Sequence, residues 1–102
     1  SAGLDYPGVS PLHCFLKDTG RARYCSASDE QALAAFKLVT KLEPSVKPSL
    51  EPAHCLHEVI RLAPKLNHDE IIIYNNCGHA YKDRKIIKDK IGYFPSWQII
   101  LI

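Results

Sequence analysis

The chain has 102 residues, of which 46% are apolar and 24% charged, and its formal net charge is +2. This length allows one domain with a modest core and is too short for two. The composition is that of a folded globular domain and excludes a disordered or fibrous chain. No stretch approaches the roughly 20 apolar residues of a membrane span, and no secretory signal opens the sequence. We therefore expect one folded domain that is cytoplasmic and has no membrane contact.

The densest positive charge lies between Lys82 and Lys90, where Asp83 and Asp89 interrupt the basic residues. This pattern is typical of a solvated helix face, so we expect no nucleic-acid partner. The four cysteines are scattered without a C-x-x-C pair, which predicts free thiols. The sequence holds no methionine and starts at Ser1, which predicts that the chain is part of a longer polypeptide.

The first half of the chain predicts a loop, a short strand and a helix. Glycine and proline are dense in residues 1–20, which predicts an irregular loop with at most one short helical turn. Residues 21–27 fit a brief strand. Ser28 and Gln31 have the spacing of a capping box, which predicts a helix over residues 29–43.

The second half predicts a helix, a strand and a further helix. Pro52 is suited to the first position of a helix that ends before Pro64. The continuous isoleucine run within Glu70–Tyr74 predicts a strand covered on both faces. A charged helix over residues 82–91, closed by Gly92, follows.

The order of these elements predicts an α/β fold with a partial, open and mostly parallel sheet flanked by helices. Residues 1–92 would form this single domain. Residues 93–102 are strongly apolar and would form a tail that must pair with a sheet, pack against a partner or aggregate.

The segment after the predicted second strand is the first candidate site, because ligands of open α/β sheets gather beyond the carboxyl ends of the strands. Cys77, Gly78 and His79 lie there, although an ordinary strand-to-helix turn uses the same residue types. A nucleophilic Cys77–His79 pair would lack an orienting third group. His54 and His57 share a helix face, but the tight ligand pairs of zinc sites are missing, so no metal is expected. A small zinc domain remains a third hypothesis.

Five blocks of sequence resemble the carboxy-terminal part of the tryptophan synthase beta-subunit, a pyridoxal phosphate enzyme of fold type II. The blocks are SAGLDYPGV at 1–9 with Pro11 and His13 after it, GRARY at 20–24, DEQALAAFKL at 29–38, LEPAH at 50–54 and NNCGHAYKD at 75–83. The family forms L-tryptophan from L-serine and indole, as a carbon–oxygen lyase of tryptophan biosynthesis. The resemblance therefore implies pyridoxal phosphate as the cofactor and an incomplete portion of that fold.

The resemblance also implies six site residues: Gly3, Asp5, Tyr6, Glu51, Cys77 and Gly78. Both glycines would lie close to the cofactor. Asp5 would contact the departing hydroxyl of serine, and Tyr6 would sit at the mouth of the indole channel. Glu51 would handle protons on the reacting side. Cys77 would accompany the pyridine nitrogen, where a thiol is a weak partner.

The Schiff-base lysine and the glycine-rich phosphate loop of the family have no counterpart in this sequence. The resemblance therefore implies an inactive fragment that needs the missing amino-terminal part of a beta chain, or another beta chain, with the tryptophan synthase alpha subunit as a further partner. The alternative is a non-catalytic interaction module built on the same scaffold. His79 and Tyr81 favour this alternative, because they replace an arginine and an aspartate of the family.

Overall fold

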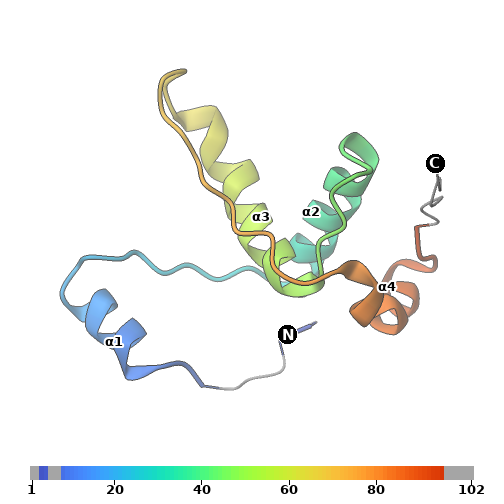
Figure 1. The fold of residues 1–102 in the computed structure, drawn as a ribbon, viewed down its shortest axis with the longest axis horizontal. Coiled ribbons are helices and arrows are strands. Elements are labelled where there is room, and N and C mark those ends of the chain that lie inside the picture. Colours follow the sequence, from blue (N-terminus) through green and yellow to red (C-terminus); the bar gives the residue numbers. More distant parts are fainter. Residues whose placement is uncertain (1–2, 5–7, 96–102) are drawn as a thin grey trace, which may run out of the picture.

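A computed structural model describes residues 3–4 and 8–95 of the chain, and within these ranges all of its regular secondary structure is helical. The elements are α1 (Pro11–Asp18), α2 (Asp29–Leu42), α3 (Leu50–Leu62), the 3₁₀ helices η1 (Ala63–Lys65) and η2 (Ala80–Asp83), and α4 (Arg84–Ile91). Figure 1 shows α2 and α3 diverging from a common base, with α4 beside that base and α1 set apart. No helix in the described ranges combines the length and the apolar character needed to cross a membrane.

The capping box predicted at the start of α2 is confirmed. The Ser28 hydroxyl accepts the backbone N–H of Gln31 at 3.3 Å, and the Gln31 side chain accepts the backbone N–H of Ser28 at 2.8 Å. These two bonds satisfy amide groups that a helix start leaves unpaired. Acidic Asp29 and Glu30 follow in the first turn, where they complement the helix dipole.

The α3 helix begins two residues earlier than Pro52, the predicted first helical residue. Ser49 is its N-cap residue, and Pro52 occupies the third helical position. Proline is tolerated there because the amide groups of the first turn have no partner within the helix. The predicted end is close to the observed one, since Leu62 is the last α-helical residue and Pro64 lies in η1.

The first twenty residues contain more helix than predicted. Pro11 starts α1, and the Ser10 hydroxyl accepts the backbone N–H of Leu12 at 3.2 Å. A serine N-cap followed by proline is an ordinary helix-start signal. The prediction of a loop overlooked it because glycine and proline are frequent in this segment. At the other end of the chain, Gly92 closes α4 with a φ of +82°, as predicted, although the predicted start at Lys82 falls within η2.

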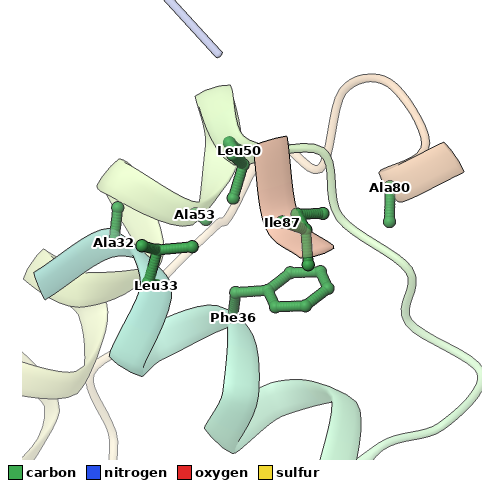
Figure 2. Close-up of a cluster of buried hydrophobic side chains, with 7 residues drawn as sticks. All are labelled: Ala32, Leu33, Phe36, Leu50, Ala53, Ala80 and Ile87. Carbon is green, nitrogen blue, oxygen red and sulfur yellow. The ribbon is translucent and has the colours of Figure 1, made fainter. Parts of the chain in front are cut away.

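A small core joins α2, α3, η2 and α4 at the base of the structure (Figure 2). Its members are Ala32, Leu33, Phe36, Leu50, Ala53, Ala80 and Ile87. Phe36, Leu50 and Ile87 are completely buried. The alanines let the backbones approach, because the distance between packed helices depends on the side chains at the contact. The core therefore fixes the first turn of α3 against α2 and α4.

The predicted parallel sheet is wrong, because the described residues contain no strand. Residues 70–74 are extended, yet Ile71 is 86% exposed to solvent and Ile73 is 93% exposed. In the part of the chain that the structure describes, the amides of residues 71–78 donate no hydrogen bond to another backbone group. A strand exists only as a member of a hydrogen-bonded ladder, so the isoleucine run alone could not form one.

The other predicted strand, residues 21–27, has no backbone ladder. The N–H groups of Arg21 and Ala22 donate to the carbonyl of Leu16 at 3.0 and 3.1 Å, and side chains hold the residues that follow. His13 Nδ1 lies 2.9 Å from the Tyr24 hydroxyl, and the Arg23 guanidinium donates to Glu58 of α3 at 2.9 Å. Hydrogen bonds from Arg61 and then Arg23 lower the pKa of Glu58 to about 2. This segment and residues 73–77 line two different grooves along α3, and they do not pair with each other.

Candidate functional site

Distant parts of the sequence meet at the first turn of α3. The backbone N–H of Leu50 donates to Asp83 Oδ2 at 2.8 Å in a buried contact. The Ser49 hydroxyl donates to the carbonyl of Cys77 at 3.1 Å. An anionic acceptor at a helix N-terminus is favoured by the helix dipole and by the unpaired amides of the first turn. These bonds fix residues 77–83 against the start of α3.

Two glycines of the predicted site make this close approach possible. Gly3 has a φ of +75°, and a Cβ there would lie 2.6 Å from the Cβ of Leu50. Gly78 has a φ of +70°, and a Cβ there would lie 2.7 Å from the Ser49 hydroxyl. Both the left-handed backbone and the lack of space require glycine. The structure therefore explains both glycines by packing against α3.

An open groove of about 430 Å³ runs between α3 and the extended segment that precedes Cys77. Its lining residues are Glu51, Pro52, Cys55, Val59, Ile73, Tyr74, Asn75 and Cys77. Glu51 stands on the first turn of α3, whereas Cys77 stands on the loop that Ser49 holds. The groove thus brings together the predicted proton-handling carboxylate and the predicted partner of the pyridine nitrogen.

The polar groups of this groove are of two kinds. Glu51 is half-buried and lies 3.7 Å from the ammonium group of Lys82, which also contacts Asp83 Oδ1 at 3.2 Å. Burial raises the pKa of Tyr74 to about 12, with the nearby Cys55 and Cys77 thiols adding to the shift. The groove therefore offers the Glu51 side chain, with the Lys82 ammonium group just outside the lining, and a Tyr74 hydroxyl that keeps its proton at neutral pH.

The groove suits the ring of pyridoxal phosphate better than its phosphate. Uncharged Tyr74, Asn75 and Cys77 line it beside one carboxylate, and no lysine or arginine is among its lining residues. The Leu50 amide, which a phosphate could use at the start of α3, is already bound to the Asp83 carboxylate. The described residues therefore fit one side of such a cofactor and do not fit the phosphate.

Comparison with curated proteins identifies the relatives of the chain. It is 50% identical to the tryptophan synthase beta chain of Cereibacter sphaeroides over 93 residues, which are 91% of this chain and 22% of that protein. For Allorhizobium ampelinum the identity is 53% over 83 residues, 81% of this chain and 20% of the relative. For Ruegeria pomeroyi it is 48% over 96 residues, 94% of this chain and 23% of the relative.

This chain is a homologue of part of the tryptophan synthase beta chain. It spans about a fifth of the length of the curated relatives that it matches. No family model matches it. The resemblance drawn from the five sequence blocks is thereby confirmed.

The remaining residues that the beta-chain resemblance singles out lie in different places. Asp5 and Tyr6 are outside the described residues. Gly3 is packed against Leu50, and the groove is lined by side chains from α3 and residues 73–77. The structure therefore places Glu51 and Cys77 together and leaves the surroundings of Asp5 and Tyr6 as predictions.

The histidines considered as chemical groups serve local structure. His79 Nδ1 accepts the backbone N–H of Tyr81 at 3.1 Å, which caps η2. His54 Nδ1 lies 2.6 Å from the carbonyl of Leu50, one turn earlier in α3. Within residues 3–4 and 8–95, no three His, Cys, Asp or Glu side chains are grouped so that they could hold a metal ion.

Sequence reasoning gave no role to Asp83 or Ser49, which position the groove. Asp83 closes the last block that resembles the beta chain, yet its bond to Leu50 spans 33 residues. No local pattern encodes a contact at that separation. The only available signal was the carboxylate directly before a charged helix, which suggests a cap of that helix. The structure shows that it binds the start of α3 instead.

Proposed function

We propose that this chain supplies one wall of the active site of a pyridoxal phosphate-dependent tryptophan synthase beta chain, which joins indole to L-serine to form L-tryptophan. The observation that carries the proposal is the shared groove of Glu51 and Cys77, which are distant in sequence and are held together by the bonds of Ser49 and Asp83. Homology to beta chains supports the same assignment.

In this proposal each groove residue has a distinct task. Pyridoxal phosphate supplies the electron sink for the reaction when it is bound. Glu51 takes up or delivers a proton at the reacting side, and the Lys82 ammonium group lies 3.7 Å from its carboxylate. Cys77 gives the pyridine nitrogen an uncharged neighbour. Asp5 and Tyr6 contact serine and line the path of indole, as the resemblance implies.

The proposal assigns the phosphate cradle and the Schiff-base lysine to other polypeptide. The groove lacks a cation among its lining residues, so the phosphate needs donors from the amino-terminal part of a beta chain or from another beta chain. The tryptophan synthase alpha subunit is a further partner in this proposal. The chain on its own is then expected to bind the cofactor weakly and to form no tryptophan.

A chimaera tests this assignment. The 93 residues of this chain that match the Cereibacter sphaeroides beta chain would replace the corresponding region of that protein, and tryptophan formation from serine and indole would be measured. We expect an active chimaera that loses about 10²–10⁴-fold in kcat upon Glu51→Gln, the range for general acid–base catalysis. Glu43→Gln makes the same chemical change on the exposed end of α2 and should leave kcat unchanged. Equal activity of Glu51→Gln and Glu43→Gln would refute the role of Glu51.

The isolated chain provides the second half of this test. After incubation with pyridoxal phosphate and reduction with borohydride, we expect no stoichiometric lysine adduct by mass spectrometry. A single modified lysine together with tryptophan formation by the chain alone would overturn the proposal.

The second candidate function is a non-catalytic interaction module. The almost complete exposure of Ile71 and Ile73 favours it, because apolar side chains on a surface mark contacts with other molecules. The chimaera separates the two functions. A folded chimaera that binds pyridoxal phosphate but forms no tryptophan would favour the module.

A further inference from the structure

Two hollows on the surface of α2 meet at one side chain, Leu38. The first measures about 490 Å³ and is lined by Lys37, Leu38, Thr40, Lys41, Tyr93 and Pro95. The second measures about 160 Å³ and is lined by Leu38, Val39, Leu42, Glu43, Leu56 and Ile60. We call these two hollows together the α2 groove. It leads from the residues after α4 into the space between α2 and α3.

The α2 groove exposes large apolar side chains to solvent. Leu38 is 42% exposed, Leu42 is 65% exposed, and Ile60 of α3 is 39% exposed. In the second hollow Glu43 is the only charged lining residue. Adjacent apolar side chains of this size are rarely left bare on a monomer and indicate that another segment covers them. That segment should itself be apolar and uncharged.

Residues 96–102 of this chain have the required composition and the required starting point. They read Ser-Trp-Gln-Ile-Ile-Leu-Ile and contain no charged residue. The residue before them, Pro95, already lines the first hollow beside Leu38. An extended chain of this length reaches roughly 23 Å, the length of about fifteen residues of helix. Residues 96–102 can therefore follow the groove along α2.

We propose that residues 96–102 dock into the α2 groove and cover Leu38, Leu42 and Ile60. Trp97 would enter the first hollow, where the side chains of Lys37 and Lys41 can pack on its ring and their ammonium groups can face it. The aliphatic residues that follow would fill the hollow between α2 and α3. A covalently attached segment has a high effective concentration at its own groove, which favours the same chain over a second copy.

The position of the groove distinguishes this proposal from the active-site assignment. The α2 groove uses Leu56 and Ile60 of α3, whereas the groove of Glu51 and Cys77 uses Cys55 and Val59. Figure 1 shows the extended segment on the flank of α3 away from α2. Docking of residues 96–102 would therefore leave Glu51 and Cys77 accessible, and either proposal can fail without the other.

Trp97 is the only tryptophan of the chain, so its fluorescence reports directly on the docking. In the full chain we expect emission shifted to shorter wavelength and protection from acrylamide, both independent of protein concentration. Leu42→Glu should abolish the shift and the protection by placing a carboxylate in the groove. Ile71→Glu makes a comparable change at a side chain that is 86% exposed on the extended segment, and it should leave both signals unchanged.

Three results would overturn the proposal. The first is Trp97 emission and quenching equal to those of the unfolded chain. The second is a wavelength shift that appears only as concentration rises and a dimer forms in light scattering, which would identify a second copy as the occupant. The third is a loss of protection in Ile71→Glu with none in Leu42→Glu. Should Leu42→Glu lose helical circular dichroism, Ile60→Gln replaces it, because it alters the same hollow from α3 and should give the same loss.

Discussion

The first turn of α3 and the extended segment at residues 70–77 differ in how far the rest of the chain buries their side chains and pairs their backbone amides. Leu50 is fully buried, and its amide binds the Asp83 carboxylate. Ile71 and Ile73 are instead almost fully exposed, and the amides of residues 71–78 donate to no backbone group in the described part of the chain. The chain therefore builds the anchor of the Glu51 groove by itself, while the extended segment on the outer side of that groove leaves the apolar side chains of Ile71 and Ile73 in solvent.

This difference separates the residues that stabilise the fold from those that are available for contact. Buried backbone polar groups require partners, so a change at the anchor should cost stability in the isolated chain. A side chain already surrounded by water loses little when it is replaced. Each of the following predictions tests one side of this comparison by urea unfolding of the isolated chain.

The largest loss of stability is expected for Gly78→Ala. Alanine would have to adopt a left-handed backbone, which costs about 1–2 kcal/mol, and its Cβ would lie 2.7 Å from the Ser49 hydroxyl, which adds about 1–3 kcal/mol of overpacking. Gly92 also has a positive φ, but no atom lies within 4 Å of a Cβ placed there. Gly92→Ala should therefore lower the free energy of unfolding only by the backbone cost of about 1–2 kcal/mol. Equal losses in the two variants would show that the anchor is not tightly packed.

A smaller loss, about 2–3 kcal/mol, is expected for Asp83→Ala. Asp83 is 5% exposed and accepts the Leu50 amide, and removing the acceptor leaves a buried N–H group without a partner. Asp89→Ala removes an exposed carboxylate from α4 and should change the free energy of unfolding by less than about 0.5 kcal/mol. If the two variants unfold at the same urea concentration, the Asp83 bond does not hold α3.

The smallest effect, within about 0.5 kcal/mol, is expected for Ile71→Thr. The side chain is 86% exposed, so its replacement buries and exposes almost nothing in the isolated chain. The same substitution in the chimaera should destabilise the protein more, because the complete beta chain would cover this position. A large loss in the isolated chain would mean that Ile71 is already packed.

The sequence predicted most of the elements that depend on local bonds, helix α1 excepted, and failed where the structure depends on distant contacts. The Ser28–Gln31 capping box and the Gly92 end of α4 involve neighbours along the chain, and both are confirmed. The isoleucine run at residues 71–73 predicted a strand wrongly, because a strand is defined by a partner that the sequence pattern does not supply. Helix α1 was missed because its Ser10 cap lies among glycines and prolines.

The candidate site was predictable to a similar extent. Resemblance to beta chains identified Glu51 and Cys77, which the structure places in one groove. It did not identify the bond between Asp83 and Leu50. The two residues are 33 positions apart, and the rest of α3 and the extended segment lie between them in the sequence. The predicted roles of Asp5 and Tyr6 depend on the resemblance alone.

Lys82 forms ion pairs with one carboxylate of the groove and one carboxylate of the α3 anchor. Its ammonium group stands 3.7 Å from Glu51 and 3.2 Å from Asp83, so one cation is shared by a carboxylate that faces the groove and a carboxylate that holds α3. Replacing Lys82 would therefore remove an ion-pair partner from the groove and from the anchor of α3 in a single step.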